Sequence, residues 1–211
     1  MTTTLYYAPG SASMLVHWLL LELDLPHELC LVDTAAKAQK RPDYLALNPN
    51  GVVPTLVIDG QPQYEAAALA MLLAERYPDE RLAPLPDDSR RADYLQWMFN
   101  LANMVQPLFR QWWYPGEPAG EANADAIRAH CAPRIEAEWQ RIDDHLAANG
   151  PHLLGEGLSV ADFYLVMLMR WSRNMPKPAT EWPHLAALAQ RLKARPSFKA
   201  LYEREGLAEW A

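Results

Sequence analysis

The hydrophobic periodicity of this chain changes about one third of the way along. Up to about residue 78, short β-like runs alternate with helical patterns, and Asp59-Gly60 is a hairpin turn signal between two of the runs. The last helical pattern ends at Pro78, where proline cannot continue a helix. The expected order is strand 4–8, helix 13–23, strand 27–33, strand 53–59, strand 61–64 and helix 65–78. A βαβ unit followed by ββα predicts one small α/β domain.

Beyond Asp87 nearly every segment has the 3.6-residue period of an amphipathic helix. The stretch YPDERLAPLPDDS, between Arg76 and Arg90, is rich in Pro and Asp and is typical of a linker. We therefore expect one domain over residues 1–80, a linker over 81–87 and an all-α bundle over 88–211. Its helices are expected near 88–114, 121–149, 159–174, 183–194 and 196–205.

Composition excludes several classes of function. A net charge of −7 argues against nucleic acid and against an anionic membrane surface, since both call for a basic face. The Met-Thr-Thr-Thr start has no signal-peptide pattern, and no run of about twenty apolar residues predicts a membrane span. Cys30 and Cys131 are isolated, and the six His lack metal-ligand spacing. We expect a cytoplasmic protein without a metal site.

The most specific segment is NPNGVVPTLVIDG, residues 48–60. Asn48 to Gly51 predict a turn, and Pro54 then opens a strand although proline cannot donate a ladder hydrogen bond. If the Val53–Pro54 bond is cis, the backbone N–H and C=O of Val53 are free to pair with an extended peptide ligand. The alternative is an ordinary turn before an edge strand.

A second feature is the helix start at Glu65. A carboxylate is favoured at this end of a helix, and the unpaired N–H groups of Ala66 and Ala67 form an anion site beside it. A carboxylate next to an anion-binding helix start suits an amino-acid end group, which carries both an ammonium and a carboxylate. The alternative is a plain first-turn Glu.

A third feature is the pair Ser11 and Ser13, which lies between a strand and a mostly apolar helix. A helix N-terminus lowers the pKa of a nearby thiol, and a hydroxyl donor lowers it further. The alternative is that one serine is merely the N-cap, and we expect one to cap and the other to contact a sulfur. A γ-amino-acid end group, an extended peptide middle and a thiol together describe glutathione.

With these features on one chain, the sequence resembles a soluble glutathione S-transferase, and within that family the bacterial beta-like group. The resemblance rests on YYAPGSAS, DYLALNPNGVVPTLVIDG, the Glu65 helix and LSVADFYL (158–165), and it covers essentially the whole chain. It implies a thioredoxin-like N-terminal domain with a cis-Pro54, an all-α C-terminal domain and a two-fold homodimer. Ser159 and Asp162 fit the family's capping box, a folding signal.

The resemblance also implies roles for individual residues. Val53 pairs with the cysteinyl backbone of glutathione, Glu65 and Ala66 hold the γ-glutamyl end, and Lys37 reaches the glycine carboxylate. Ser13 aligns better with a family site serine, whereas Ser11 lies closer to the loop.

The chain departs from the family pattern at three places. Ala12 stands where beta-like relatives often carry a Cys, which disfavours a route through a mixed disulfide. Ala66 offers only its backbone N–H where many relatives have Ser, and Gln106 stands where some have His. The hydroxyl of Tyr6 or Tyr7 is a further, less favoured thiol ligand, because most strand tyrosines serve packing.

The resemblance also implies that the electrophile binds along the segment LANMVQPLFRQWWYP, residues 101–115, which is rich in aromatic residues. Met104, Trp112 and Trp113 are its candidate pocket residues, with an ordinary core stripe as the alternative. Pro107 is expected to kink or interrupt this helix. The implied activity is a detoxifying transfer of the glutathione thiolate to a hydrophobic electrophile. Two alternatives stay open: a glutathione-dependent isomerase or peroxidase, and a glutathione-binding protein with little turnover.

Overall fold

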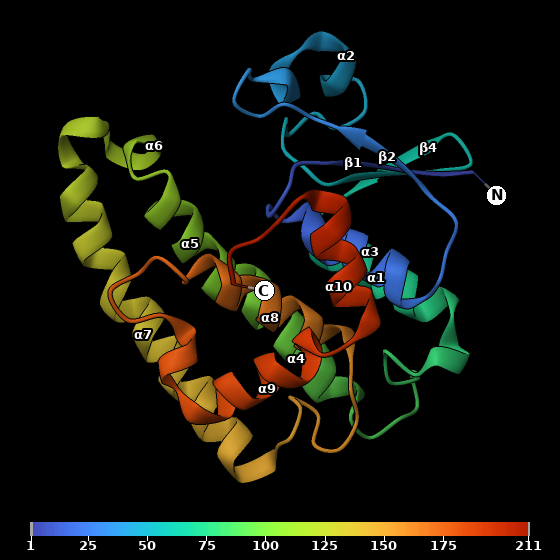
Figure 1. Ribbon diagram of the computed structural model, residues 1–211, viewed down its shortest axis with the longest axis vertical. Coiled ribbons are helices and arrows are strands. Elements are labelled where there is room, and N and C mark those ends of the chain that lie inside the picture. Colours follow the sequence, from blue (N-terminus) through green and yellow to red (C-terminus); the bar gives the residue numbers. More distant parts are fainter. Residues whose placement is uncertain (1, 211) are drawn as a thin grey trace. The chain divides into compact units, whose positions relative to one another are not determined.

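The computed structural model describes residues 2–210. The α/β part contains a four-stranded sheet in the order β2-β1-β3-β4. Strand β1 is parallel to β2 and antiparallel to β3, and β3 is antiparallel to β4. This is the thioredoxin-like arrangement (Figure 1). Its elements are β1 (Thr3–Tyr7), α1 (Ser13–Glu22), β2 (Glu28–Leu31), η1 (Ala38–Lys40), α2 (Pro42–Leu45), β3 (Thr55–Ile58), β4 (Gln61–Tyr64), α3 (Ala66–Arg76) and η2 (Pro78–Glu80).

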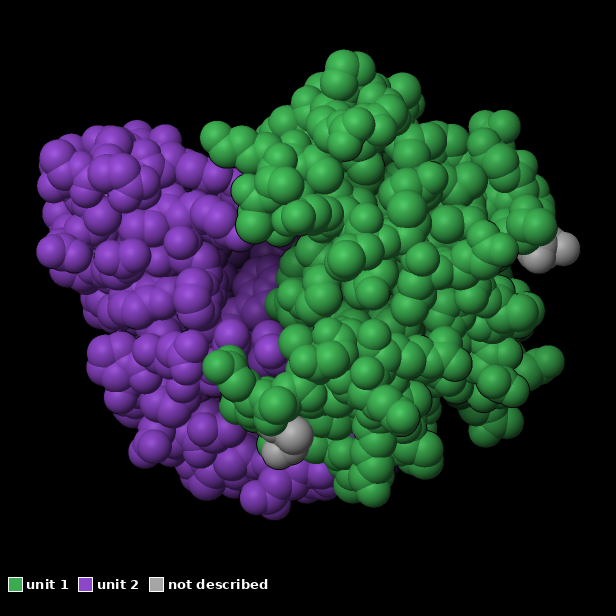
Figure 2. All heavy atoms as spheres, turned by 45° about the horizontal axis from the view of Figure 1, so that its top comes forward, with its two compact units in different colours: residues 1–82, 193–211 green, residues 83–192 purple. Residues whose placement is uncertain are grey.

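The chain separates into two compact units, coloured differently in Figure 2. The first unit joins residues 1–82 to residues 193–211, and the second unit is residues 83–192. The last helix therefore belongs to the α/β unit, whereas sequence analysis groups it with the helical bundle. The division into domains 1–80 and 88–211 remains a prediction.

Helix α1 is the centre of the first unit. Every residue from Ser13 to Leu20 is buried, and a helix that is apolar all round requires partners on every side. One partner is α10 (Pro196–Glu205), which packs along it (Figure 1). The Trp18 indole N–H donates to the Ser197 hydroxyl at 2.9 Å, and the Phe198 ring lies 5.1 Å from the Trp18 ring.

The second unit is built from helices. They are α4 (Arg91–Asn100), η3 (Leu101–Val105), α5 (Gln106–Trp113), α6 (Gly116–Ala119), η4 (Glu121–Asn123), α7 (Ala124–Asn149), α8 (Val160–Trp171), η5 (Ala179–Glu181) and α9 (Pro183–Lys193). Pro107 interrupts the expected long helix, as predicted. It has no N–H to donate to the preceding turn, and the helix passes through the π-helical segment Leu101–Val105 just before it.

The predicted capping box is present at the start of α8. Asp162 is completely buried and accepts the backbone N–H groups of Leu153 and Ser159, both at 2.8 Å. The Ser159 hydroxyl accepts the N–H of the third helical residue. Burial raises the pKa of the Asp162 carboxyl, and these hydrogen bonds act against that rise. Within residues 2–210, the helices are all too short or too polar to cross a membrane.

Candidate functional site

The Ser13 side chain links the end of β1 to the start of α1 through hydrogen bonds. Its side chain is fully buried, and its Oγ accepts the Ala8 N–H and donates to the Ala8 C=O, each at 3.1 Å. It also lies 2.8 Å from the Ser11 Oγ. A hydroxyl has one proton and two lone pairs, so these three partners use all of its capacity.

Ser11 has the hydroxyl that remains available. Its side chain is half-buried, and its Oγ accepts the Ser13 N–H at 3.2 Å, in place of a cap from Ala12. Because the Ser13 proton is directed to Ala8, the proton between the two serines belongs to Ser11. That O–H can rotate toward a bound group without breaking the loop. The geometry therefore favours Ser11 over Ser13 as the donor to a ligand.

The loop before the serines is held by the C-terminal helix. Gly10 has φ +68°, a conformation that glycine adopts at little cost. Its N–H donates to Glu205 Oε2 at 2.8 Å, and Glu205 Oε1 lies 2.8 Å from His17 Nδ1. This tie between Gly10 and Glu205 was not predicted from the sequence.

The backbone just before β3, where an extended peptide would pair, is held in place by side-chain hydrogen bonds. The Tyr44 hydroxyl donates to the Val52 C=O at 2.7 Å, and Asn48 Nδ2 donates to the same oxygen at 2.8 Å. Burial raises the pKa of Tyr44. The Val53–Pro54 bond is cis, as the resemblance implies. Within residues 2–210, the Val53 N–H and C=O have no hydrogen-bond partner, so both are available.

Glu65 lies at the start of α3 in a backbone conformation that side chains rarely adopt, with φ +75° and ψ +106°. Such outliers concentrate at functional sites. Its exposed carboxylate accepts a 3.4 Å hydrogen bond from Asn50 Nδ2. The first-turn N–H groups from Ala66 onward have no partner within their helix, and such groups favour a negative charge at this end of α3.

Lys37 and Lys40 precede β3 in the sequence, and their side chains have different surroundings. Lys37 is exposed in a left-handed conformation with φ +56°. Lys40 contacts the turn before β3, because its Nζ donates to the Asn50 C=O at 3.3 Å. A Cβ at Gly51 would lie 2.8 Å from that Nζ and 2.9 Å from the Gln39 C=O, so only glycine fits there. Lys40 did not stand out in the sequence.

The predicted pocket residues lie in the second unit. Met104 is 49% exposed and Trp113 39% exposed, whereas Trp112 is half-buried. The Trp113 indole N–H donates to the Trp171 C=O at 3.2 Å, and the Arg173 guanidinium lies 5.7 Å from its ring centre. Trp113 is thus an oriented, accessible aromatic surface.

Two further side chains of this segment are already engaged within the second unit. Arg110 is paired with Glu117 and lies 4.1 Å above the Tyr114 ring. Gln106 accepts a hydrogen bond from the Tyr164 hydroxyl, so this residue, found where some relatives have His, is anchored to α8.

Comparison with known proteins agrees with this fold. Residues 5–81 match the family model for the N-terminal domain of glutathione S-transferases, and residues 102–205 match that for the C-terminal domain. A glutathione S-transferase of Xanthomonas campestris is 32% identical, over 96% of this chain and 98% of that protein. One of Escherichia coli is 29% identical, over 96% and 98%. The chain belongs to the glutathione S-transferase family, and it is an enzyme of that family.

A solved structure extends the comparison to the ligand and to the fold. A glutathione transferase homologue from Sulfitobacter, solved with bound glutathione, superposes with a TM-score of 0.89 at 28% identity and covers 98% of this chain and 99% of its own. The family contains other activities, since a maleylacetoacetate isomerase of Rhizobium meliloti is 29% identical over 80% of each chain.

Proposed function

We propose that this protein binds glutathione on its α/β unit and transfers the glutathione thiolate to a hydrophobic electrophile. The observation that carries the proposal is the serine pair at the start of α1, in which Ser13 is saturated and the Ser11 O–H, donated to Ser13 Oγ, can rotate to donate to a ligand instead. Family membership and the glutathione-bound homologue support the choice of ligand.

Each part of glutathione has a counterpart in this unit. The free N–H and C=O of Val53, next to Pro54, pair with the cysteinyl backbone. The Glu65 carboxylate takes the γ-glutamyl ammonium, and the N–H groups from Ala66 onward take its carboxylate. For the glycine carboxylate we propose Lys40 beside Lys37, because the Lys40 Nζ already donates to the Asn50 C=O in the turn before β3.

The chemistry follows from the sulfur's position at the start of α1. The Ser11 O–H donates to the sulfur, and the N-terminal end of α1 favours negative charge there, so the thiol pKa falls. The thiol proton passes to water. The thiolate then attacks an electrophilic carbon: a C–S bond forms, and in a substitution the bond to the leaving group breaks with its electron pair.

The electrophile is proposed to contact the accessible side chains of the 101–115 segment. Met104 and Trp113 offer exposed apolar surface, and the half-buried Trp112 directly precedes Trp113. Cytoplasmic location, a detoxifying role and homodimer formation also remain proposals. They rest on the net charge of −7, the isolated cysteines and family membership.

The test combines binding with turnover. Calorimetry measures glutathione binding, and a generic aryl halide measures transfer. We expect saturable binding and turnover for the wild type, with Glu65→Ala weakening glutathione binding about tenfold or more, since a charge-assisted hydrogen bond is lost. Glu80→Ala, an exposed change outside the site, is the matched control.

The remaining outcomes separate the alternatives. Binding without turnover on any electrophile would support a binding protein. Activity with a hydroperoxide or a cis-enone acid alone would support a peroxidase or an isomerase. Absence of glutathione binding would overturn the proposal.

A further inference from the structure

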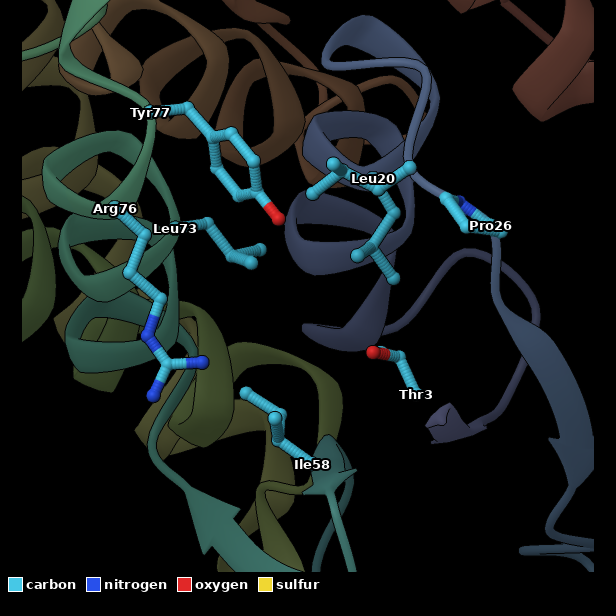
Figure 3. Close-up of a pocket in the computed structure, with 8 residues that line it drawn as sticks. Thr3, Leu20, Pro26, Ile58, Leu73, Arg76 and Tyr77 are labelled. Carbon is cyan, nitrogen blue, oxygen red and sulfur yellow. The ribbon is translucent and has the colours of Figure 1, made fainter. Parts of the chain in front are cut away.

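A small cavity lies in the α/β unit, between α1, α3 and the sheet (Figure 3). Its volume is ≈ 50 Å³. The floor is apolar: Leu20 comes from α1, Leu73 from α3 and Ile58 from the end of β3, and Leu20 and Leu73 are almost completely buried. A cavity on the order of 150 Å³ holds the six carbons of a benzene molecule, so this one, with about a third of that volume, holds a tail of two or three carbon atoms.

The cavity and the proposed glutathione site lie at opposite ends of β1 and of α3. It lies at the first residue of β1 and the last residues of α3, whereas the serines follow β1 and Glu65 precedes α3. Helix α3 alone, from Ala66 to Arg76, spans roughly 16 Å at 1.5 Å per residue. A ligand here would not compete with glutathione.

Three polar groups converge on this apolar floor. Figure 3 shows the Thr3 and Tyr77 hydroxyls directed into the space and the Arg76 guanidinium at its side. None of these three side chains has a hydrogen bond or ion pair to another residue of the 2–210 range. A mostly apolar hollow with a few convergent polar groups is the usual form of a small-molecule site.

The hydrogen-bonding capacity and charge of Thr3, Arg76 and Tyr77 indicate which kind of ligand the cavity would bind. Arg76 can only donate hydrogen bonds, both hydroxyls can donate, and the described lining contains no acidic side chain. The last carbonyls of α3 carry about half a negative charge, which the full charge of Arg76 outweighs. The ligand that suits this cavity is therefore an anion that accepts hydrogen bonds and has a short apolar tail.

We propose that this cavity is a binding site for a short aliphatic carboxylate of about four carbons. The carboxylate accepts from Arg76 and from the Tyr77 hydroxyl, and the hydrocarbon tail lies among Leu20, Ile58 and Leu73. The site is independent of the proposed transferase activity.

The probe is sodium butyrate, titrated into the full chain while methyl NMR signals of Leu73 and Ile58 are followed at constant ionic strength. We expect saturable shifts with a Kd of about a millimolar. Arg76→Gln should weaken binding about fivefold or more, since a charge-assisted hydrogen bond is lost at a partly exposed site. Arg81→Gln, an exposed change outside the lining, should leave the Kd unchanged.

Two comparisons make the test decisive. Tyr77→Phe removes the hydroxyl proposed to donate to the carboxylate and should weaken binding several-fold, and retained thermal unfolding shows that the lost affinity is not a folding defect. Butan-1-ol has the same tail without the charge and should bind at least about fivefold more weakly. Unsaturable shifts, equal binding of butan-1-ol, or unshifted methyl signals of Leu73 and Ile58 would each overturn the proposal.

Discussion

His17 Nδ1 lies 2.8 Å from Glu205 Oε1, and both side chains are completely buried although 188 residues separate them. The second carboxylate oxygen of Glu205 accepts the N–H of Gly10. One carboxylate on the last helix thus holds both α1 and the loop that presents Ser11. The conformation of the proposed catalytic loop depends on the C-terminal helix.

Removing this carboxylate should destabilise the protein strongly. Glu205→Ala leaves His17 and the Gly10 N–H without their acceptor, and the loss of one partner of a buried pair costs about 3–5 kcal/mol in free energy of unfolding. Denaturant unfolding followed by circular dichroism measures the change. The control is Glu203→Ala on the exposed side of the same helix. If the two variants unfold with equal free energies, the pair does not stabilise the fold.

A second carboxylate caps a helix from a distance. Asp143 Oδ1 accepts the backbone N–H groups of His184 and Leu185, at 2.8 and 2.9 Å, although Asp143 belongs to α7 and these residues begin α9. Asp143→Ala should lower the free energy of unfolding by about 1–3 kcal/mol, because one buried and one partly buried backbone donor lose their acceptor. The control is Asp144→Ala at the exposed neighbouring residue, which should lower the free energy of unfolding far less. Similar losses for both would show that the cap contributes little.

The ion pair at the start of α4 should be visible as a shifted titration. The Arg90 guanidinium and backbone N–H, hydrogen-bonded to Asp88, lower the pKa of that carboxyl to about 2 from its ordinary 3.8. A depressed pKa stabilises the folded state above pH 3.8, and that contribution disappears as pH falls toward 2.

Carboxyl NMR measures this directly. Arg90→Ala should return the Asp88 pKa toward 3.8, and high salt should do so in part because the pair is exposed. An unchanged pKa in Arg90→Ala would mean that Arg90 is not its cause.

Local signals predicted the regular elements well. The helix expected over 13–23 is α1 (Ser13–Glu22), and that expected over 65–78 is α3 (Ala66–Arg76), because an apolar run with a clear start and a stop is a strong pattern. Helices α2 and α6 were missed. Each has four residues, which is too short to show a 3.6-residue period.

In the candidate site too, residues with a local sequence signal were predicted, and residues that act across the fold were not. Ser11, Ser13, Val53 and Glu65 stand out because turn and helix-start residues act on their own backbone or on immediate neighbours. The groups that hold them were not predicted. Tyr44 reaches Val52 across eight residues, and Glu205 reaches Gly10 across 195. Contacts of that kind depend on tertiary packing, which leaves no periodic signal in one sequence.

The central claim is that Ser11 lowers the pKa of the glutathione thiol while Ser13 holds the loop. The most direct measurement is the thiolate absorbance of bound glutathione as a function of pH, for the wild type, Ser11→Ala and Ser13→Ala. We predict a wild-type thiol pKa about 2 units below the ordinary value of ~8.5. Ser11→Ala should raise it by about one unit with unchanged unfolding, whereas Ser13→Ala should mainly destabilise the fold. A wild-type pKa equal to that of free glutathione, or one that Ser11→Ala leaves unmoved, would contradict this account.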